Sequence, residues 1–194
     1  MKIIFNLLCS LALIILLSCT QQAVNRDVID THLLEGSVFK HAMDKNADWL
    51  LSLEPDRLLH RFRLNANLEP KAEIYAGWET LGVSGHSLGH YLSACAMMYA
   101  TTGNEKFKAR VDYIVDELAE CQKARKTGYV GAIPDEDRIW KEVSEGNIRY
   151  DGFGLNGGWV PWYALHKVWA GLIDSYKLTG SKQALGSEYA FRFI

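Results

Sequence analysis

The sequence predicts an all-α protein made of helical hairpins, as in part of a helical toroid. Apolar residues recur at helical spacing in several segments that glycine or proline separates. Residues 99–107 (YATTGNEKF) and 176–184 (YKLTGSKQA) are alike, and each joins two predicted helices across a Thr-Gly turn. In a toroid each hairpin buries its face against the next, and the loops converge on a central cleft. Two hairpins do not close a ring, so the sequence is expected to be the opening part of a larger, truncated barrel.

The first predicted helix begins at Ser37, whose side chain can cap it, and runs to about residue 53. Its apolar face is expected to consist of Phe39, Met43, Leu50 and Leu53, with Trp49 beside them. Residues 54–56 (EPD) end it, and a second short helix is expected over residues 56–62.

Residues 77–94 (GWETLGVSGHSLGHYLSA) combine a glycine-rich lead-in with a helix that carries two histidines one turn apart. The glycines permit backbone conformations that a pocket rim often needs. The helix should end before Gly103. One side of it holds His86, His90, Ser93 and Met97, and the other holds Leu88, Leu92, Cys95 and Tyr99. Two interpretations remain open: histidines that face a ligand, or histidines that bond to neighbouring carbonyl groups in a buried helix.

Asn104 predicts the start of the next helix, and its buried stripe is expected to consist of Phe107, Val111, Ile114, Leu118 and Cys121. If this helix folds back at Gly103, Cys121 lies roughly 15 Å from Cys95. We therefore expect two buried thiols and no disulfide between them.

The helical pattern breaks over residues 127–157, apart from a short helix expected over 135–144. Long irregular segments beside strong helices are often binding loops. Pro161 fits the first turn of another helix, which should end at Gly180. The apolar face of that helix is expected to be Trp162, Leu165, Trp169, Leu172 and Tyr176. A further helix begins near Ser181.

The N-terminus predicts export. Residues 1–19 have a lysine followed by an apolar run, which is typical of a signal peptide, and end in LLSC, which resembles a bacterial lipobox. Lipidation of Cys19 would tether the chain through residues 20–27 to a membrane in the bacterial periplasm or at the outer membrane, with the lipid as its only anchor. The alternative is an ordinary cleaved signal.

Length and charge narrow the function. Residues 28–194 suffice for one domain. With 21 basic and 23 acidic residues and no basic block, the chain is not expected to bind nucleic acid.

Two clusters carry candidate chemistry. His86 and His90 have the spacing of zinc-binding helices, but Ser87 stands where the metalloprotease motif has glutamate, so we assign no metal site. Residues 156–166 (NGGWVPWYALH) bring Trp159, Trp162, Tyr163 and His166 to a helix start. Aromatic rings stack on sugars while imidazoles bond to hydroxyls, so this cluster favours carbohydrate. The alternative is that the tryptophans are core residues.

Five ordered motifs resemble the β-L-arabinofuranosidase-type glycoside hydrolases of families 127 and 146. They are residues 71–79 (KAEIYAGWE), 85–94 (GHSLGHYLSA), 112–122 (DYIVDELAECQ), 128–134 (GYVGAIP) and 155–167 (LNGGWVPWYALHK). The resemblance implies an (α/α)6 barrel that acts on L-arabinofuranosides of plant glycans, with a zinc-bound cysteine as nucleophile and a glutamate as acid/base.

The family's zinc ligands and catalytic residues lie downstream of the LHK motif, so the resemblance implies no catalytic residue, no metal ligand and no cofactor within this chain. It implies that His166 binds sugar in the minus-one subsite and that His86 and His90 line the same cleft. Trp78, Glu79, Trp159, Trp162 and Tyr163 complete the expected substrate-binding set. Ala164 departs from the family's pattern, which has asparagine there.

The sequence is thus expected to be the N-terminal portion, over residues 28–194, of a secreted glycoside hydrolase with little or no activity alone. One alternative is a non-catalytic carbohydrate-binding or helical-repeat interaction lipoprotein. Another is a metal-binding lipoprotein that uses His86, His90 and His166.

Overall fold

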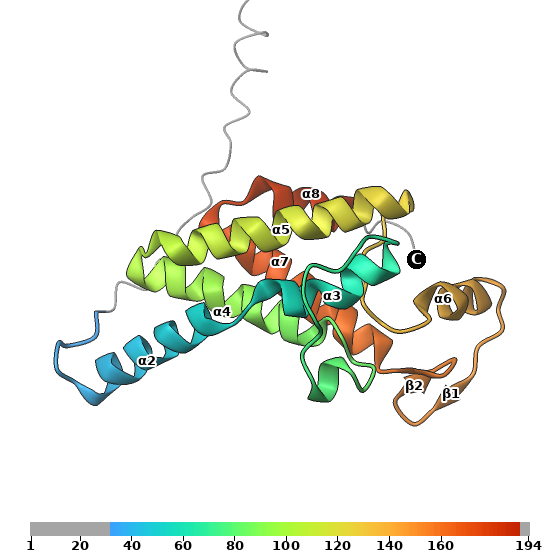
Figure 1. The fold of residues 1–194 in the computed structure, drawn as a ribbon, viewed down its shortest axis with the longest axis horizontal. Helices are drawn as coiled ribbons and strands as arrows, with labels where there is room; N and C mark the ends of the chain where they lie inside the picture. The colour runs from blue at the N-terminus through green and yellow to red at the C-terminus, as the bar shows by residue number, and fades with distance from the viewer. Residues whose placement is uncertain (1–31, 191–194) are drawn as a thin grey trace, which may run out of the picture.

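The computed structural model describes residues 32–190, which fold mainly into α-helices (Figure 1). The predicted signal peptide, the tether and Cys19 lie outside the described residues. The helices are α2 (Val38–Ser52), α3 (Pro55–Asn65), α4 (His86–Thr102), α5 (Glu105–Arg125), α6 (Glu136–Ser144), α7 (Pro161–Thr179) and α8 (Lys182–Ala190), with a 3-10 turn, η1 (Gly77–Glu79). The all-α prediction is confirmed.

Two hairpins, α4–α5 and α7–α8, form the body of the fold (Figure 1). Both turn in the same way, because Gly103 and Gly180 adopt left-handed conformations with φ of 67° and 76°. Their N–H groups donate to the carbonyl oxygens of Tyr99 and Tyr176, at 2.7 and 3.0 Å. The repeated Thr-Gly turn that the sequence predicts is therefore present twice.

Capping residues fix the helix starts where the sequence predicts them. The Ser37 side chain accepts a hydrogen bond from the N–H of Lys40, and that of Asn104 accepts from Lys106. The predicted stripe of α5 is fully buried: Phe107, Val111, Ile114, Leu118 and Cys121. Cys95 and Cys121 are both buried thiols, as expected.

Close packing of α4 against α7 is the most extensive contact between elements. A side chain on Gly171 would reach to 2.5 Å from the Gly89 carbonyl oxygen, and one on Gly89 would reach to 2.6 Å from the N of Val168. We call this close contact of α4 and α7 at Gly89 and Gly171 the seam. It leaves room only for small residues, so the buried side of α7 includes Ala164, Gly171 and Ser175. The apolar face predicted for α7 is therefore wrong in part: Leu165 and Leu172 are buried, but Trp162 is 50% exposed.

The expected apolar face of α2 is also wrong in part. Phe39 and Trp49 are 72% and 58% exposed, and Leu50 is the one residue of this helix that is fully buried. The core contacts of α2 come from residues spaced along one side of the helix, where Met43, Ala47 and Leu51 pack beside Leu50. The next helix, α3, begins at Pro55 and runs to Asn65, beyond the predicted end at residue 62.

The irregular segment contains a small antiparallel sheet as well as the predicted helix α6. Its strands are β1 (Tyr150–Asp151), β2 (Gly154–Leu155) and β3 (Gly158–Trp159), in the order β1-β2-β3. A small buried cluster of Val83, Ile133, Ile139 and Ala164 joins this region to the start of α7 and to the segment before α4. No helix within residues 32–190 is both long and apolar enough to cross a membrane.

Candidate functional site

The glycine-rich lead-in to α4 places η1 beside the first histidine. Gly77, Gly82 and Gly85 all have positive φ, at 76°, 106° and 98°, which side chains rarely adopt. At Gly85 a side chain would also approach Phe62 to 3.1 Å. The resulting turn folds Trp78 and Glu79 back toward His86.

A hydrogen bond from His86 to the backbone determines which of its ring nitrogens carries the proton. Nδ1 lies 2.7 Å from the carbonyl oxygen of Val83, which can only accept, so Nδ1 carries the proton. In the neutral ring Nε2 is then an acceptor, and the Ser87 hydroxyl lies 3.4 Å from it. His86 thus combines a structural hydrogen bond on one side with an acceptor on the other.

Glu79 is a buried carboxyl group, 4% exposed. Its Oε1 finds no hydrogen-bond partner among the described residues, and Nδ1 of His86 is 3.7 Å away. Leaving a buried polar atom unpaired costs roughly 1–3 kcal/mol, so such an atom needs an explanation.

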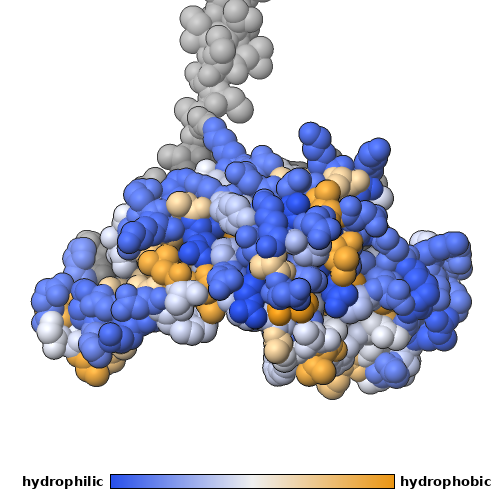
Figure 2. All heavy atoms as spheres, in the orientation of Figure 1, coloured by the Kyte–Doolittle hydropathy of each residue, from blue (hydrophilic) through white to orange (hydrophobic). Residues whose placement is uncertain are grey.

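A cavity of about 420 Å³ opens beside these groups, between α2, α4 and the segment that carries η1. Figure 2 shows the surface hollowed between α2 and that segment. The polar groups of its wall are Glu79, His86, Ser87 and His90, and the other lining residues are Trp49, Leu50, Leu53, Leu58, Tyr75, Ala76, Trp78, Tyr91 and Ala94.

Aromatic rings surround His86 on three sides. Its ring centroid lies 5.4 Å from that of Trp78, 6.2 Å from that of His90 and 6.0 Å from that of Tyr163. Trp78 and Tyr163 are 60% and 40% exposed, so parts of both rings are open to a ligand. Flat, partly exposed rings beside fixed hydrogen-bonding groups are the usual composition of a sugar site.

The pKa of His90 is lowered from its ordinary value. Partial removal of the ring from water disfavours its charged form, and the nearby basic side chains of Lys167 and His86 act in the same direction. His90 is therefore neutral at pH 7 and can both donate and accept hydrogen bonds.

The α7 residues of the expected set lie on the exposed side of its first turns. The ring of Trp162 packs against that of Trp140, with centroids 5.0 Å apart. His166 is exposed and, by helical geometry, lies between Trp162 and Tyr163 around the helix. Trp159, on β3, lines a different hollow.

Four of the eight expected residues line the cavity, namely Trp78, Glu79, His86 and His90, and Tyr163 joins them only through its ring contact with His86. Trp159, Trp162 and His166 lie in the same stretch of the chain as Tyr163, and none of these four residues lines the cavity. Sequence reasoning missed Trp49, Tyr75 and Ser87 as lining residues. A tryptophan placed beside, and not within, the apolar stripe of α2 was the available signal for Trp49.

The two cysteines of the described region lie in the core. Burial raises the pKa of the Cys95 thiol to about 11 and that of Cys121 to about 12. Because the thiolate is the reactive form, neither side chain is suited to act as a nucleophile. Within residues 32–190 no group of three or more His, Cys, Asp or Glu side chains is arranged to hold a metal ion, and this includes the set of His86, His90 and His166.

A family model described as "Beta-L-arabinofuranosidase, GH127 catalytic domain" matches residues 31–190. The match covers the whole described region and agrees with the resemblance of the five motifs. A search of curated proteins gave no match for the chain.

Proposed function

Because it matches this model over most of its length, the chain belongs to the GH127 β-L-arabinofuranosidase family, and on that premise we propose that the cavity before α4 holds one arabinofuranose ring. The helices are part of the helical barrel of this family. A glycoside hydrolase acts on carbohydrate, which agrees with the aromatic and imidazole groups around the cavity.

The unpaired Oε1 atom of Glu79 carries this proposal. Three glutamates are buried in the described region, and the other two are satisfied. Glu117 accepts from Arg63 at 2.6 Å and from Lys71 at 2.5 Å. Glu136 accepts from Arg125 at 3.0 Å and from Tyr129 at 2.9 Å. The glutamate with an unpaired oxygen is the one that lines the cavity. In this proposal its buried side chain turns toward the cavity, and a sugar hydroxyl supplies the missing donor.

The remaining groups of the site would form hydrogen bonds with the sugar or stack on its ring. Nε2 of His86 accepts from a second hydroxyl, and neutral His90 donates or accepts as the hydroxyl requires. The exposed faces of Trp78 and Tyr163 cover the C–H surfaces of the ring. His166 and Trp162 extend the site along the exposed side of α7.

We place the chain in the hydrolysis of L-arabinofuranosides of plant glycans as the contributor of sugar-binding residues. In this proposal it is exported, and a lipid on Cys19 holds it at the membrane. The resemblance implies that zinc, a cysteine nucleophile and a glutamate acid/base lie downstream of residues 155–167. The DNA beyond codon 194 tests this: an open frame that continues into glutamate and paired-cysteine motifs is expected.

Titration calorimetry with methyl β-L-arabinofuranoside tests the binding site. The variant His86→Asn keeps an amide that can donate to the Val83 carbonyl but removes the Nε2 acceptor, so affinity should fall about ten-fold, the worth of one good hydrogen bond. His41→Ala, at an exposed histidine of α2, is the matched control and should bind as the wild type does. Equal affinity of His86→Asn and the wild type would contradict the proposal.

A non-catalytic carbohydrate-binding protein would give the same binding result. Release of arabinose by the chain joined to its downstream region separates the two possibilities. We expect the 194-residue chain to bind the glycoside and to release little arabinose, because both of its described cysteines are buried thiols. Restored hydrolysis when the downstream region is joined to the chain would favour the enzyme.

A further inference from the structure

The small sheet after α6 presents two different faces, which its register defines. Asp151 pairs with Gly154 and Gly154 with Trp159, so these three form one cross-strand row. Residues directly opposite on antiparallel strands point to the same face. The other row is Tyr150, Leu155 and Gly158.

In the second row Leu155 and Gly158 face the protein, whereas Tyr150 is 83% exposed. Leu155 packs against the buried cluster that contains Ile133 and Ile139. A side chain on Gly158 would come within 2.7 Å of the Cδ1 of Ile139, so the strand lies directly on α6. The row of Asp151, Gly154 and Trp159 therefore faces away from this cluster.

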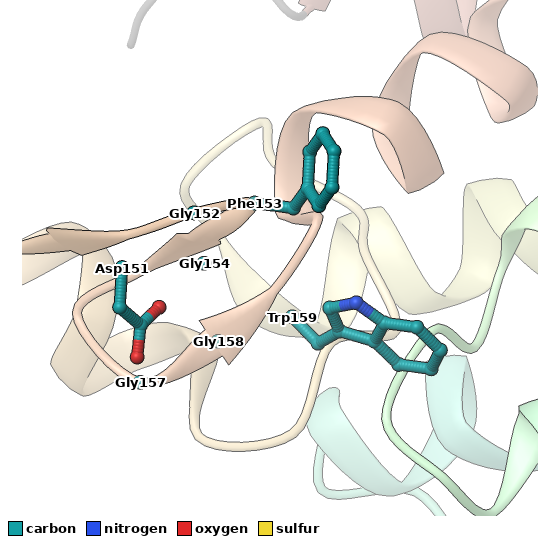
Figure 3. Close-up of a pocket in the computed structure, with 7 residues that line it drawn as sticks. All are labelled: Asp151, Gly152, Phe153, Gly154, Gly157, Gly158 and Trp159. Atoms are coloured by element: carbon teal, nitrogen blue, oxygen red, sulfur yellow. The ribbon is translucent and has the colours of Figure 1, made fainter.

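A hollow of about 400 Å³ lies on this outward row (Figure 3). Its lining residues are Asp151, Gly152, Phe153, Gly154, Gly157, Gly158 and Trp159. A side chain on Gly154 would collide with the carboxylate of Asp151. The Asp151 carboxylate therefore lies above Gly154, the middle residue of the row, and the other glycines of the lining leave the rest of the floor without side chains.

The hollow is held in place from behind. Asn156, which is buried, accepts from the N–H of Arg149 at 2.8 Å and donates to Glu142 at 2.7 Å. These bonds tie the β2–β3 turn to α6, so a ligand would meet a preformed surface.

We propose that this hollow is a second subsite, which binds a further sugar residue of the glycan held at the His86 cavity. Trp159 and Phe153 are 43% and 84% exposed and offer ring faces for stacking. The Asp151 carboxylate and the backbone groups of the glycine floor take the hydroxyls. This inference rests on the proposed function.

The lining favours a neutral polyhydroxylated ligand over other classes. Asp151 is the one charged side chain among the lining residues, so the hollow disfavours phosphates and other anions. One carboxylate is too few ligands for a cation. Trp159 also lies four residues before Tyr163, whose ring contacts His86, so one glycan could reach both places.

Calorimetry with two probes, methyl β-L-arabinofuranoside and L-arabinofuranotriose, tests the second subsite on the 194-residue chain. The wild type should bind the trisaccharide about ten-fold tighter, which is about 1.4 kcal/mol. Trp159→Ala should remove this difference and leave binding of the methyl glycoside unchanged. Asp151→Asn should weaken only the trisaccharide. Tyr150→Ala removes an exposed aromatic ring from the other row and should change neither.

The outcomes separate this inference from the proposed function. Equal affinity of the wild type for both probes, an unchanged trisaccharide affinity in Trp159→Ala, or equal weakening of both probes would overturn the second subsite alone. Trisaccharide binding that survives His86→Asn and is lost in Trp159→Ala would overturn the His86 site alone. A wild-type chain that binds neither probe would overturn both.

Discussion

Replacing Gly89 by alanine should destabilise the protein, although alanine is the better helix former. The added methyl group would collide with the carbonyl of Lys167 and lie 2.6 Å from the N of Val168. Both neighbours are backbone atoms, so neither can rotate away, and overpacking of this kind costs about 3 kcal/mol. The higher helix propensity of alanine stabilises the helix by about 1 kcal/mol, so the free energy of unfolding should fall by about 2 kcal/mol in total. For a domain of this size the melting temperature should fall by about 4–8 °C.

Gly186→Ala is the matched control, because this glycine lies in α8 and a side chain there would meet nothing within 4 Å. It should stabilise the protein by about 0.5–1 kcal/mol. Urea unfolding followed by circular dichroism measures both variants. A Gly89→Ala protein as stable as the wild type would refute the seam between α4 and α7.

Three further predictions concern side chains. Glu79→Gln should raise the free energy of unfolding by about 1 kcal/mol, because burying an unpaired neutral amide costs less than burying an unpaired carboxylate. The same substitution should weaken the binding of methyl β-L-arabinofuranoside. Unchanged affinity in calorimetry would show that Glu79 does not contact the sugar. Because the pKa of His90 is lowered in the folded chain, the unfolded chain takes up its proton first, so stability and sugar affinity should be constant above pH 6.5 and fall on acidification below it. In His90→Gln the sugar affinity should change little between pH 5 and 7. A pH dependence as steep as that of the wild type would mean that a group other than His90 causes it. Iodoacetamide at pH 8 should modify Cys95 and Cys121 only after unfolding, as peptide mass spectrometry would show, since burial keeps both thiols protonated.

Local signals in the sequence predicted the helices well. Ser37 and Asn104 cap helices where their side chains suggested, and Gly103 and Gly180 end helices in left-handed conformations. The stripe of α5 was predictable because its apolar residues repeat over about four turns against a charged opposite face. In each case the deciding interaction lies within a few residues along the chain.

The errors arise where long-range packing decides. On α7 the largest apolar side chains suggested a buried face, but the close approach to α4 selects the side with Ala164 and Gly171 and leaves Trp162 half exposed. The small sheet was missed because strands of two residues carry no periodic signal. Of the expected site, the glycine-rich lead-in with Trp78, Glu79 and His86 was accessible from sequence because these residues are neighbours along the chain.

The contact between His86 and Tyr163 shows why the seam matters for binding. These residues are far apart in sequence, and each lies in the first turn of its helix, α4 or α7. Their ring centroids can lie 6.0 Å apart only because the two helices touch at Gly89 and Gly171. A substitution that spreads the helices should therefore lower sugar affinity without altering any residue of the cavity. In Gly89→Ala the loss of affinity should accompany the loss of stability, whereas in His86→Asn the affinity should fall more than the stability. That contrast distinguishes a residue that positions the site from one that contacts the sugar.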